Sequence, residues 1–342
     1  MERSGSDRTI LMDRVESDRL CGMKRFVVVN GRLADRYEET ARRLSAISGE
    51  FVAEFGPDDT WMDHHIGEVE IVCGSISPHF VARAGTLRWV QLQGAGVEGV
   101  VELYSGRHGV IVTNATGIHG IPMAEHLLGM MLSFAHLLHI SIRRGVEKRW
   151  DRSICDNLFE LSGRHALVVG AGSIGAAFAE RASALGMKVS AIRRNPELPV
   201  AGASRVESME SLTECLRDAD FVIDLLPATE ETERVFGKAE FDAMKSGAYF
   251  LNAGRGRTVD ESALVEALRS GSIAGAGLDV FEAEPLPADS SLWEMENVIL
   301  TPHVSGDTPE YSRRLLDIFS ENFERYIAGK KLNNTIDLDL GY

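Results

Sequence analysis

The chain has 342 residues, 44% of them hydrophobic and 25% charged, which is the composition of a globular protein long enough for two domains. Its 36 basic and 51 acidic residues give a formal net charge of −15, which argues against binding to nucleic acid or to an anionic membrane. The four cysteines are widely spaced without a CxxC pair, so neither a zinc knuckle nor a disulfide framework is predicted, and a reducing cytoplasm is expected.

The first part of the chain predicts a small parallel sheet. Residues 1–22 mix both charge signs and lack the continuous apolar run of a secretory signal, so we expect a loose N-terminal extension. The β-branched run at 26–29 ends in a turn signal and is followed by apolar residues at helical spacing, which predicts a βα unit. Further short apolar runs, typical of strands, occupy 70–73, 87–92 and 110–113.

Residues 121–140 form an apolar stretch about long enough to span a bilayer. The stretch also contains one glutamate and three histidines, which are costly inside a membrane, and the chain offers no second candidate span. Pro122 suits the first turn of a helix. We therefore expect a helix that is buried in a core or a subunit interface rather than in a membrane.

The second part of the chain has a more regular strand-then-helix rhythm, which predicts a doubly wound parallel sheet. Its predicted strands are 165–170, 189–192, 221–226, 249–252, 275–279 and 298–301.

Residues 309–329 predict an amphipathic helix that follows this already complete sheet. Its apolar side carries Tyr311, Leu315, Phe319, Phe323 and Tyr326. We expect this helix to cross back and pack on the N-terminal domain.

The predicted fold is therefore α/β, with two Rossmann-like or flavodoxin-like parallel-sheet domains and a cleft between them. Residues 23–119 plus 307–342 are expected to form a substrate domain. Residues 120–306 are expected to form a dinucleotide-binding domain.

A glycine-rich loop follows the first strand of the second sheet. Residues 165–175 (HALVVGAGSIG) read as an apolar strand and a GxGxxG turn that opens a helix, which is the context of a dinucleotide-binding fingerprint. Gly170 permits the tight turn, Gly172 lets the backbone approach a pyrophosphate, and Gly175 lets helix and strand pack closely. With Ser173 and Ile174 at the helix N-terminus, these residues are predicted to bind the cofactor.

Two arginines stand where an NAD-specific protein carries an acidic residue. Arg193 lies 18 residues after Gly175, at the end of the second strand, and Arg194 follows it. A guanidinium can bind a ribose 2′-phosphate with paired hydrogen bonds, whereas a carboxylate would repel it. NADP(H) is therefore the predicted cofactor, with NAD(H) as an alternative. The competing interpretation of the two arginines is a solvated basic turn.

Three further residues follow later strands of the same sheet: Arg255, Glu284 and His303. Arg255 suits a substrate carboxylate because its planar fork matches that group. His303 suits a proton donor, and Glu284 would favour the imidazolium, raise the pKa of His303 and fix its orientation. Taken singly, each residue has an ordinary alternative: a surface charge, an acidic loop or a satisfied core histidine.

The motifs LSGRHALVVGAGSIG, DLLPATEET, LNAGRGRTVDESAL, GAGLDVFEAEPLP and ENVILTPHVSG resemble those of the D-isomer specific 2-hydroxyacid dehydrogenase family. The similarity extends from about Lys24 to Ile336, and it points to an NADP-preferring branch like the glyoxylate/hydroxypyruvate reductases. It implies that Arg255 binds substrate, that His303 donates the proton and that Glu284 is its partner. It also implies cofactor contacts from Leu226, Pro227, Thr232, Ala253, Gly254, Arg255, Asp279, His303, Ser305 and Gly306, with Asp279 near the nicotinamide amide.

The resemblance also assigns the N-terminal half. RWVQLQGAGVEGV resembles the family's substrate loop, in which the backbone N–H groups of Ala95 and Gly96 would hold a carboxylate, although Glu98 stands where an aspartate is usual. Ser75 and Ile76 are expected to face the substrate. TNATGIHGIPMAEHLLGMML resembles the hinge and the long interface helix, which implies a homodimer built through the cofactor domains.

Other functions fit the sequence less well. The histidine pairs lack the carboxylate or cysteine pattern of a metal site, so no metal is expected. Formate dehydrogenases are similar but carry glutamine where Glu284 stands, and the chain ends too soon after His303 for the added regulatory domain of many phosphoglycerate-type enzymes. The remaining alternative is a non-catalytic NAD(P) sensor similar to corepressors. The sequence does not identify the 2-keto or 2-hydroxy acid, because the pocket walls are formed by loops whose spacing follows no recognisable pattern.

Overall fold

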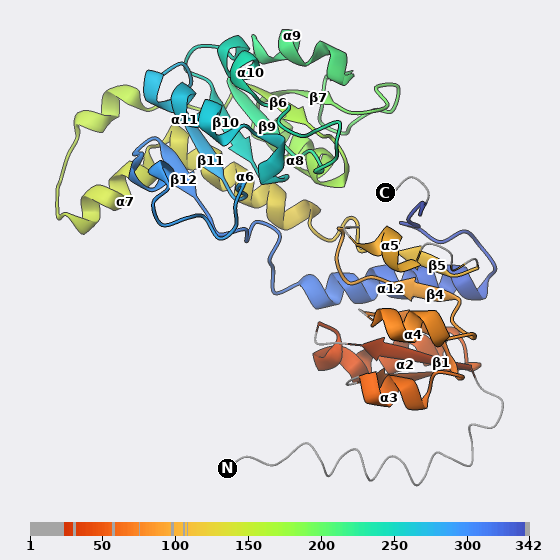
Figure 1. Cartoon of the computed structure of the whole chain (residues 1–342). Coiled ribbons are helices and arrows are strands. Elements are labelled where there is room, and N and C mark those ends of the chain that lie inside the picture. The colour runs from red at the N-terminus through yellow and green to blue at the C-terminus, as the bar shows by residue number, and fades with distance from the viewer. Residues whose placement is uncertain are drawn as a thin grey trace. The chain divides into compact units, whose positions relative to one another are not determined.

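The computed structural model divides into two compact units. Unit 1 comprises the described residues up to Ile118 together with those from Pro309 onward, and unit 2 runs from His119 to Thr308 (Figure 1). The expected N-terminal extension lies outside the described residues. The structure describes residues 24–29, 32–56, 59–74, 76–96, 99–104, 107 and 109–338.

Unit 1 contains a five-stranded parallel sheet in the order β2-β1-β3-β4-β5, the flavodoxin-like arrangement. The strands are β1 (Lys24–Val29), β2 (Phe51–Gly56), β3 (Val69–Cys73), β4 (Trp89–Gln91) and β5 (Ile111–Thr113). β2 was not predicted from the sequence, although its side chains alternate between buried and less buried as a strand's do.

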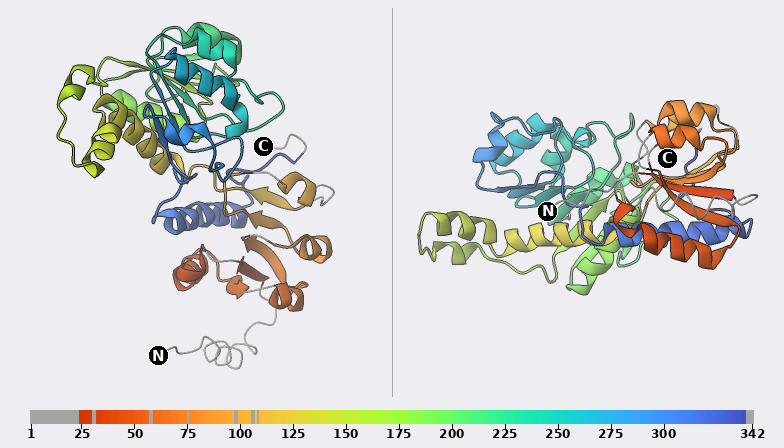
Figure 2. Two further views of the ribbon diagram at one scale, coloured as in Figure 1. Left: turned by 60° about the vertical axis from the view of Figure 1, so that its left-hand side comes forward. Right: turned by 90° about the horizontal axis from the view of Figure 1, so that it is seen from below.

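Helices cover both faces of this sheet. One cluster combines α2 (Tyr37–Ile47) and α12 (Tyr311–Ile327), which lie side by side (Figure 2), with buried residues of β2, β3 and β4. The apolar side expected for the C-terminal helix lies in this cluster and includes the fully buried Phe319 and Phe323. The opposite face carries α3 (Asp59–His64), α4 (Pro78–Arg83) and α5 (Val100–Tyr104). The short 3₁₀ helix η1 (Ala34–Arg36) precedes α2.

Unit 2 contains a seven-stranded parallel sheet in the order β12-β11-β10-β9-β6-β7-β8, which is the Rossmann order with one strand added. All six strands predicted from the sequence are present. The seventh strand, β8, was not predicted. The strands are β6 (His165–Val169), β7 (Lys188–Ile192), β8 (Arg205–Glu207), β9 (Phe221–Asp224), β10 (Tyr249–Asn252), β11 (Gly275–Leu278) and β12 (Val298–Leu300).

Alternate side chains of these strands feed two separate cores. Ala166 and Val168 pack with α6 (Gly120–Ala135) and α8 (Ser173–Ala184), whereas Leu167 and Val169 pack on the other face. That face is covered by α9 (Leu212–Leu216), α10 (Lys238–Ala243) and α11 (Glu261–Ser270). The 3₁₀ helices are η2 (Ser153–Asn157), η3 (Met209–Ser211), η4 (Gly256–Thr258) and η5 (Ser291–Glu294).

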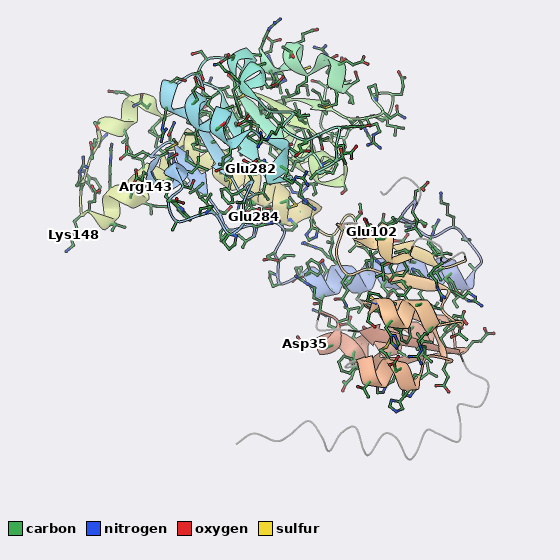
Figure 3. The ribbon with its side chains drawn as sticks, viewed as in Figure 1. Asp35, Glu102, Arg143, Lys148, Glu282 and Glu284 are labelled. Carbon is green, nitrogen blue, oxygen red and sulfur yellow. The ribbon has the colours of Figure 1, made fainter. Side chains whose placement is uncertain are left out.

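The continuous helix predicted over 121–140 is corrected to two helices. α6 ends at Ala135, and α7 (Leu138–Val146) begins after Leu137, whose φ of 49° is left-handed and cannot continue a helix. α6 is largely buried, whereas α7 has no buried residue. Arg143, labelled in Figure 3, lies on α7, and its guanidinium donates to backbone carbonyls before and within β12.

Among the described residues, no single helix is long and apolar enough to cross a bilayer. α6 and α7 meet that test only when they are taken together, and they are bent by 72° at their break.

Candidate active site

Three loops interlock where β6, β9 and β10 end. Gly170 has a φ of 95°, and a Cβ there would lie 2.6 Å from the carbonyl carbon of Leu225. A Cβ on Gly254 would lie 2.7 Å from the carbonyl oxygen of Leu226. Neither position can accept a side chain, so backbone packs on backbone across the carboxyl edge of the sheet.

The glycine loop then starts α8 with Gly172 as its N-cap residue. A Cβ on Gly175 would lie 2.9 Å from Cγ1 of Val168, which accounts for the close packing of α8 on β6. A Cβ on Gly172 would meet no protein atom within 4 Å. Glycine at that position therefore keeps open space beside the first turn of α8, which contains Ser173 and Ile174. Helix N-termini attract anions, and a pyrophosphate fits this site.

Arg193 and Arg194 follow β7, the neighbour of β6 in the sheet. Nη1 of Arg193 donates to the carbonyl of Leu198 at 3.4 Å, which is a long contact. The exposed guanidinium of Arg194 lies 4.0 Å from the carboxylate of Glu231. Both arginines thus follow the strand that neighbours the strand of the glycine loop, and their turn is at least partly exposed to solvent.

Arg255 lies immediately after β10 in an extended conformation, with φ −141° and ψ 142°. Its carbonyl oxygen accepts hydrogen bonds from Nδ2 of Asn252 at 3.1 Å and from the hydroxyl of Thr258 at 2.6 Å. Its Nη1 donates to the carbonyl of Gly254 at 2.9 Å. The backbone around Arg255 is therefore held by side chains on both sides of it in the chain.

Glu284 and His303 meet although they are far apart in sequence. Oε2 of Glu284 lies 2.7 Å from Nδ1 of His303, and its Oε1 accepts the N–H of Phe281 at 3.0 Å. A carboxylate only accepts, so Nδ1 carries hydrogen and Nε2 is the nitrogen left for proton exchange. Figure 3 labels Glu284 on the loop after β11; His303 follows β12, the adjacent strand. The sheet thus places Arg255, Glu284 and His303 after three neighbouring strands.

Asp279 organises the loop that contains His303, a role that the sequence analysis did not assign. Its buried carboxylate accepts hydrogen bonds from the Thr301 hydroxyl at 2.6 Å and from the N–H groups of Val304 and Ser305, each at 2.9 Å. Burial raises the pKa of Asp279, but the hydrogen bonds outweigh burial and the net pKa is lowered. His303 itself has a φ of 53°, a strained conformation for a non-glycine residue, and its N–H donates to the Asp279 carbonyl.

His126 joins the same network from α6. Its Nε2 lies 3.0 Å from the hydroxyl of Thr301, which donates to Asp279. Burial lowers the pKa of His126 and the nearby Asp279 carboxylate opposes that shift. A neutral ring with hydrogen on Nε2 satisfies the contact, because the one proton of the Thr301 hydroxyl is already donated.

The other predicted cofactor residues lie on the turns around this edge. Thr232 closes the turn after β9 by donating to the carbonyl of Pro227 at 2.5 Å and accepting the N–H of Thr229. Nδ1 of His119 lies 3.1 Å from the carbonyl oxygen of Gly306, next to the buried Ser305. Leu226 and Ala253 belong to the interlocked loops and are buried.

In unit 1, Ala95 and Gly96 lie on the loop after β4. Nδ2 of Asn114 donates to the carbonyl of Ala95 at 2.9 Å. Within the described part of the chain, the N–H groups of Ala95 and Gly96 donate no hydrogen bond. Glu98 and Ser75, two other residues singled out in the sequence, lie outside the described residues.

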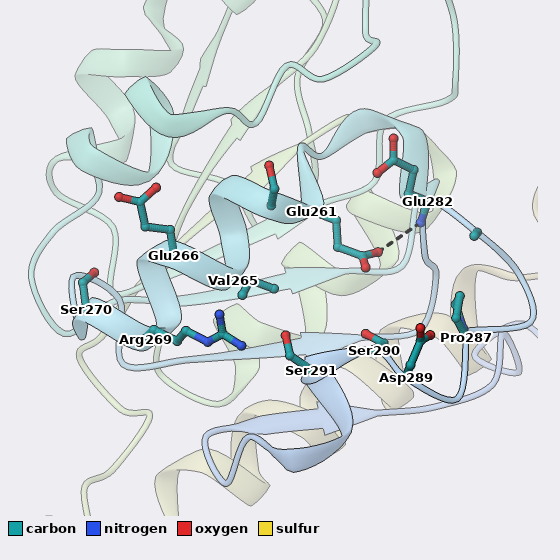
Figure 4. A pocket seen from close by; sticks show the side chains of 12 residues that line it. Glu261, Val265, Glu266, Arg269, Ser270, Glu282, Pro287, Asp289, Ser290 and Ser291 are labelled. Atoms are coloured by element: carbon teal, nitrogen blue, oxygen red, sulfur yellow. Dashed lines mark hydrogen bonds between the residues drawn. The ribbon is translucent and has the colours of Figure 1, made fainter.

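An open cavity of about 880 Å³ lies between α11 and the loop after β11 (Figure 4). Its wall contains Arg269 and four carboxylates: Glu261, Glu266, Glu282 and Asp289. This excess of negative charge disfavours nucleotide phosphates and organic acids. The cavity therefore does not replace the carboxyl edge of the sheet as the candidate site.

Comparison with known proteins gives a family match over unit 2. A family model described as D-isomer specific 2-hydroxyacid dehydrogenase, NAD binding domain, matches residues 128–305. A glyoxylate reductase from Korarchaeum cryptofilum is 31% identical over 278 residues, covering 80% of this chain and 82% of that protein.

Two further comparisons differ in coverage. A D-3-phosphoglycerate dehydrogenase from Methanocaldococcus jannaschii is 34% identical over 75% of this chain, which spans only about half (49%) of that relative's length. A D-isomer specific 2-hydroxyacid dehydrogenase from Xanthobacter autotrophicus, solved in complex with NADPH and MES, is 31% identical with a TM-score of 0.76, over 92% of this chain and 99% of that one.

Proposed function

The chain belongs to the D-isomer specific 2-hydroxyacid dehydrogenase family, and from this premise we propose that it transfers hydride between NADP(H) and a small 2-keto or 2-hydroxy acid. The observation that carries the proposal is the 2.7 Å contact between Glu284 and His303. It holds a proton-donating imidazole at the same sheet edge as a carboxylate-binding arginine and an open glycine loop.

In the direction of reduction, Arg255 pairs with the substrate carboxylate and polarises the ketone oxygen. When bound, NADPH supplies the hydride that goes to the carbonyl carbon. His303 gives the proton on Nε2 to the oxygen that gains negative charge, which leaves a neutral ring with its hydrogen on Nδ1. Glu284 accepts that Nδ1 hydrogen throughout, so it fixes the tautomer and stabilises the imidazolium before transfer.

The glycine loop and α8 fit the cofactor's pyrophosphate, with Gly172 at the point of closest approach. Arg193 and Arg194 then bind the 2′-phosphate that distinguishes NADP(H) from NAD(H). The support for this preference is the absence of an acidic residue at the end of β7, and the Xanthobacter relative holds NADPH. Weak use of NAD(H) is the alternative.

Ala95 and Gly96 are proposed to hold the substrate carboxylate through their backbone N–H groups. Among the described residues neither N–H group has an acceptor, and two successive N–H groups of this kind are the donor arrangement that binds anions. The hydrogen bond from Asn114 to Ala95 supports the proposal, because it fixes the loop that presents them.

The direct test follows the absorbance of NADPH with glyoxylate, hydroxypyruvate, pyruvate and bulkier 2-keto acids. We expect turnover with at least one acid in this panel. Tight NADPH binding without turnover of any acid would refute the proposed activity and favour the non-catalytic sensor.

A homodimer is the proposed assembly. Ile142, Val146 and Trp150 are 69%, 82% and 93% exposed on α7 and the segment after it, and such apolar exposure is typical of a surface that another chain covers. Replacing Ile142 and Val146 with glutamate should convert a dimer into monomers in light scattering coupled to size exclusion. A monomeric wild-type chain would contradict the assembly without affecting the proposed activity.

A further inference from the structure

A buried polar network lies next to Arg255 and has no part in the reaction as proposed. Asp224, the last residue of β9, is fully buried, as is Thr258 on η4. Oδ1 of Asp224 accepts the N–H of Leu226 at 2.9 Å, and its Oδ2 lies 2.5 Å from the hydroxyl oxygen of Thr258. The same hydroxyl oxygen lies 2.6 Å from the carbonyl oxygen of Arg255.

The protons in this network can be counted. The Thr258 hydroxyl has one hydrogen but contacts two oxygens, and the Arg255 carbonyl can only accept. If Asp224 were ionised, one of these two short contacts would have no hydrogen between its oxygens. A hydrogen on Oδ2 of Asp224 resolves the conflict, because Asp224 then donates to Thr258 and Thr258 donates to Arg255.

The electrostatic environment favours that neutral form. Burial raises the pKa of Asp224 to about 7, since the opposing hydrogen bonds from Thr258 and Leu226 are weaker than the cost of burying the charge. Within the described residues, these are the only hydrogen bonds to its carboxyl group.

Few charged or titratable groups occur on the elements that flank Asp224. β6 and β10 carry His165 and Tyr249, both at their amino ends and so at the opposite edge of the sheet. The turn after β10 carries Arg255 and Arg257, and Arg257 forms an ion pair with Glu233.

We propose that Asp224 is a positioning residue for Arg255, which it holds through Thr258 by donating a proton into a continuous chain of hydrogen bonds. The inference rests on the proposed role of Arg255 in binding the substrate. When Asp224 loses its proton, the Thr258 hydroxyl turns to the carboxylate and the Arg255 carbonyl loses that donor, keeping the one from Asn252. Alignment of the guanidinium then weakens.

The first experiment removes the relay. Thr258→Val should lower kcat/KM for the preferred 2-keto acid about tenfold, the effect of one lost hydrogen bond, while the Kd for NADPH stays within about twofold. Thr258→Ser keeps the hydroxyl and should restore kcat/KM to within about threefold of wild type. Thr40→Val is the matched control, because Thr40, in α2 of unit 1, is also fully buried and donates to the backbone carbonyl of Arg36 at 2.9 Å. The control should leave kcat/KM unchanged.

The second experiment tests the proton on Asp224. In Asp224→Asn the amide Nδ2 donates to Thr258 at every pH, so the ratio of wild-type to variant kcat/KM should fall several-fold as the pH rises above about 7. Titrations common to both proteins cancel in this ratio. Infrared difference spectra should show a carboxylic-acid band in wild type that disappears over the same pH range and is missing from the variant.

Each result has a distinct meaning. A wild-type infrared spectrum without the band, or turnover that Thr258→Val leaves unchanged, would overturn the relay while the proposed function stands. A wild-type protein that binds NADPH but reduces no 2-keto acid would instead refute the proposed function, and the infrared band still decides the protonation of Asp224.

Discussion

Replacing Asp224 with asparagine should change how the stability of the folded chain depends on pH, and this prediction needs no assay of catalysis. Asp224 has a pKa of about 7 when folded, against 3.8 for an ordinary aspartate. Each tenfold change in proton affinity between the unfolded and the folded chain corresponds to about 1.4 kcal/mol, so the proton bound in the folded state contributes at most ~4 kcal/mol.

The sign follows from where the proton is held. Because the folded pKa is the higher one, the stabilising contribution is complete below about pH 3.8 and is lost as the pH rises through about 7. Over that window the free energy of unfolding of wild type falls by up to ~1.4 kcal/mol per pH unit from this group alone. Asparagine cannot ionise, so the Asp224→Asn variant should become more stable relative to wild type by up to ~4 kcal/mol across the window.

The assay is urea denaturation of both proteins, followed by far-ultraviolet circular dichroism at matched pH values between about 4 and 8, which cover nearly all of the window and extend above it. Subtracting one curve from the other removes every titration that the two proteins share. Asp289→Asn, on the exposed loop after β11, controls for the removal of a carboxylate. A difference between Asp224→Asn and wild type that stays constant over the whole pH range would refute a neutral Asp224.

Three further predictions concern the proposed site. His303→Asn should lower kcat about 10²- to 10⁴-fold with little change in the Kd for NADPH, measured by absorbance and by fluorescence titration; retained turnover would remove His303 as proton donor. Replacing Arg193 and Arg194 with serine should lower the kcat/KM preference for NADPH over NADH at least about tenfold, and an unchanged preference would support the solvated-turn interpretation. Gly172→Ala should raise the Kd for NADPH without lowering Tm. Gly175→Ala should lower Tm, because its Cβ would lie 2.9 Å from a side-chain carbon in β6. Equal effects of the two variants on Tm would contradict this distinction.

The sheet of unit 2 was predictable wherever a strand is an apolar run. The strand FVID of β9 and its neighbours in unit 2 are buried on both faces, and their sequences show it. β8 has only the three residues RVE at the edge of the sheet, so neither length nor hydrophobicity marks it. The helix break at Leu137 was also hidden, because leucine carries no signal for a left-handed conformation.

The candidate site was predictable by residue type but not by contact. Glu284 and His303 were singled out because a carboxylate and an imidazole suit proton transfer, yet only the adjacency of β11 and β12 brings them together. Asp224 and Thr258 were missed altogether. An aspartate that ends an apolar strand gave a faint signal, but its hydroxyl partner lies 34 residues away and follows from the pairing of β9 with β10.

The two buried aspartates at this edge have opposite pKa shifts, and the difference follows from their donors. Asp279 accepts one hydroxyl and two backbone N–H groups, and these outweigh burial and keep it ionised. An ionised Asp224 could accept only one backbone N–H and the hydroxyl of Thr258, and burial outweighs these two donors. An ionised Asp279 anchors the loop that contains His303, and its negative charge would favour the protonated imidazole that the proposed proton transfer requires. In the proposed relay a neutral Asp224 can donate to Thr258, whose own hydrogen then goes to the Arg255 carbonyl, whereas an ionised Asp224 would draw that hydrogen away from Arg255.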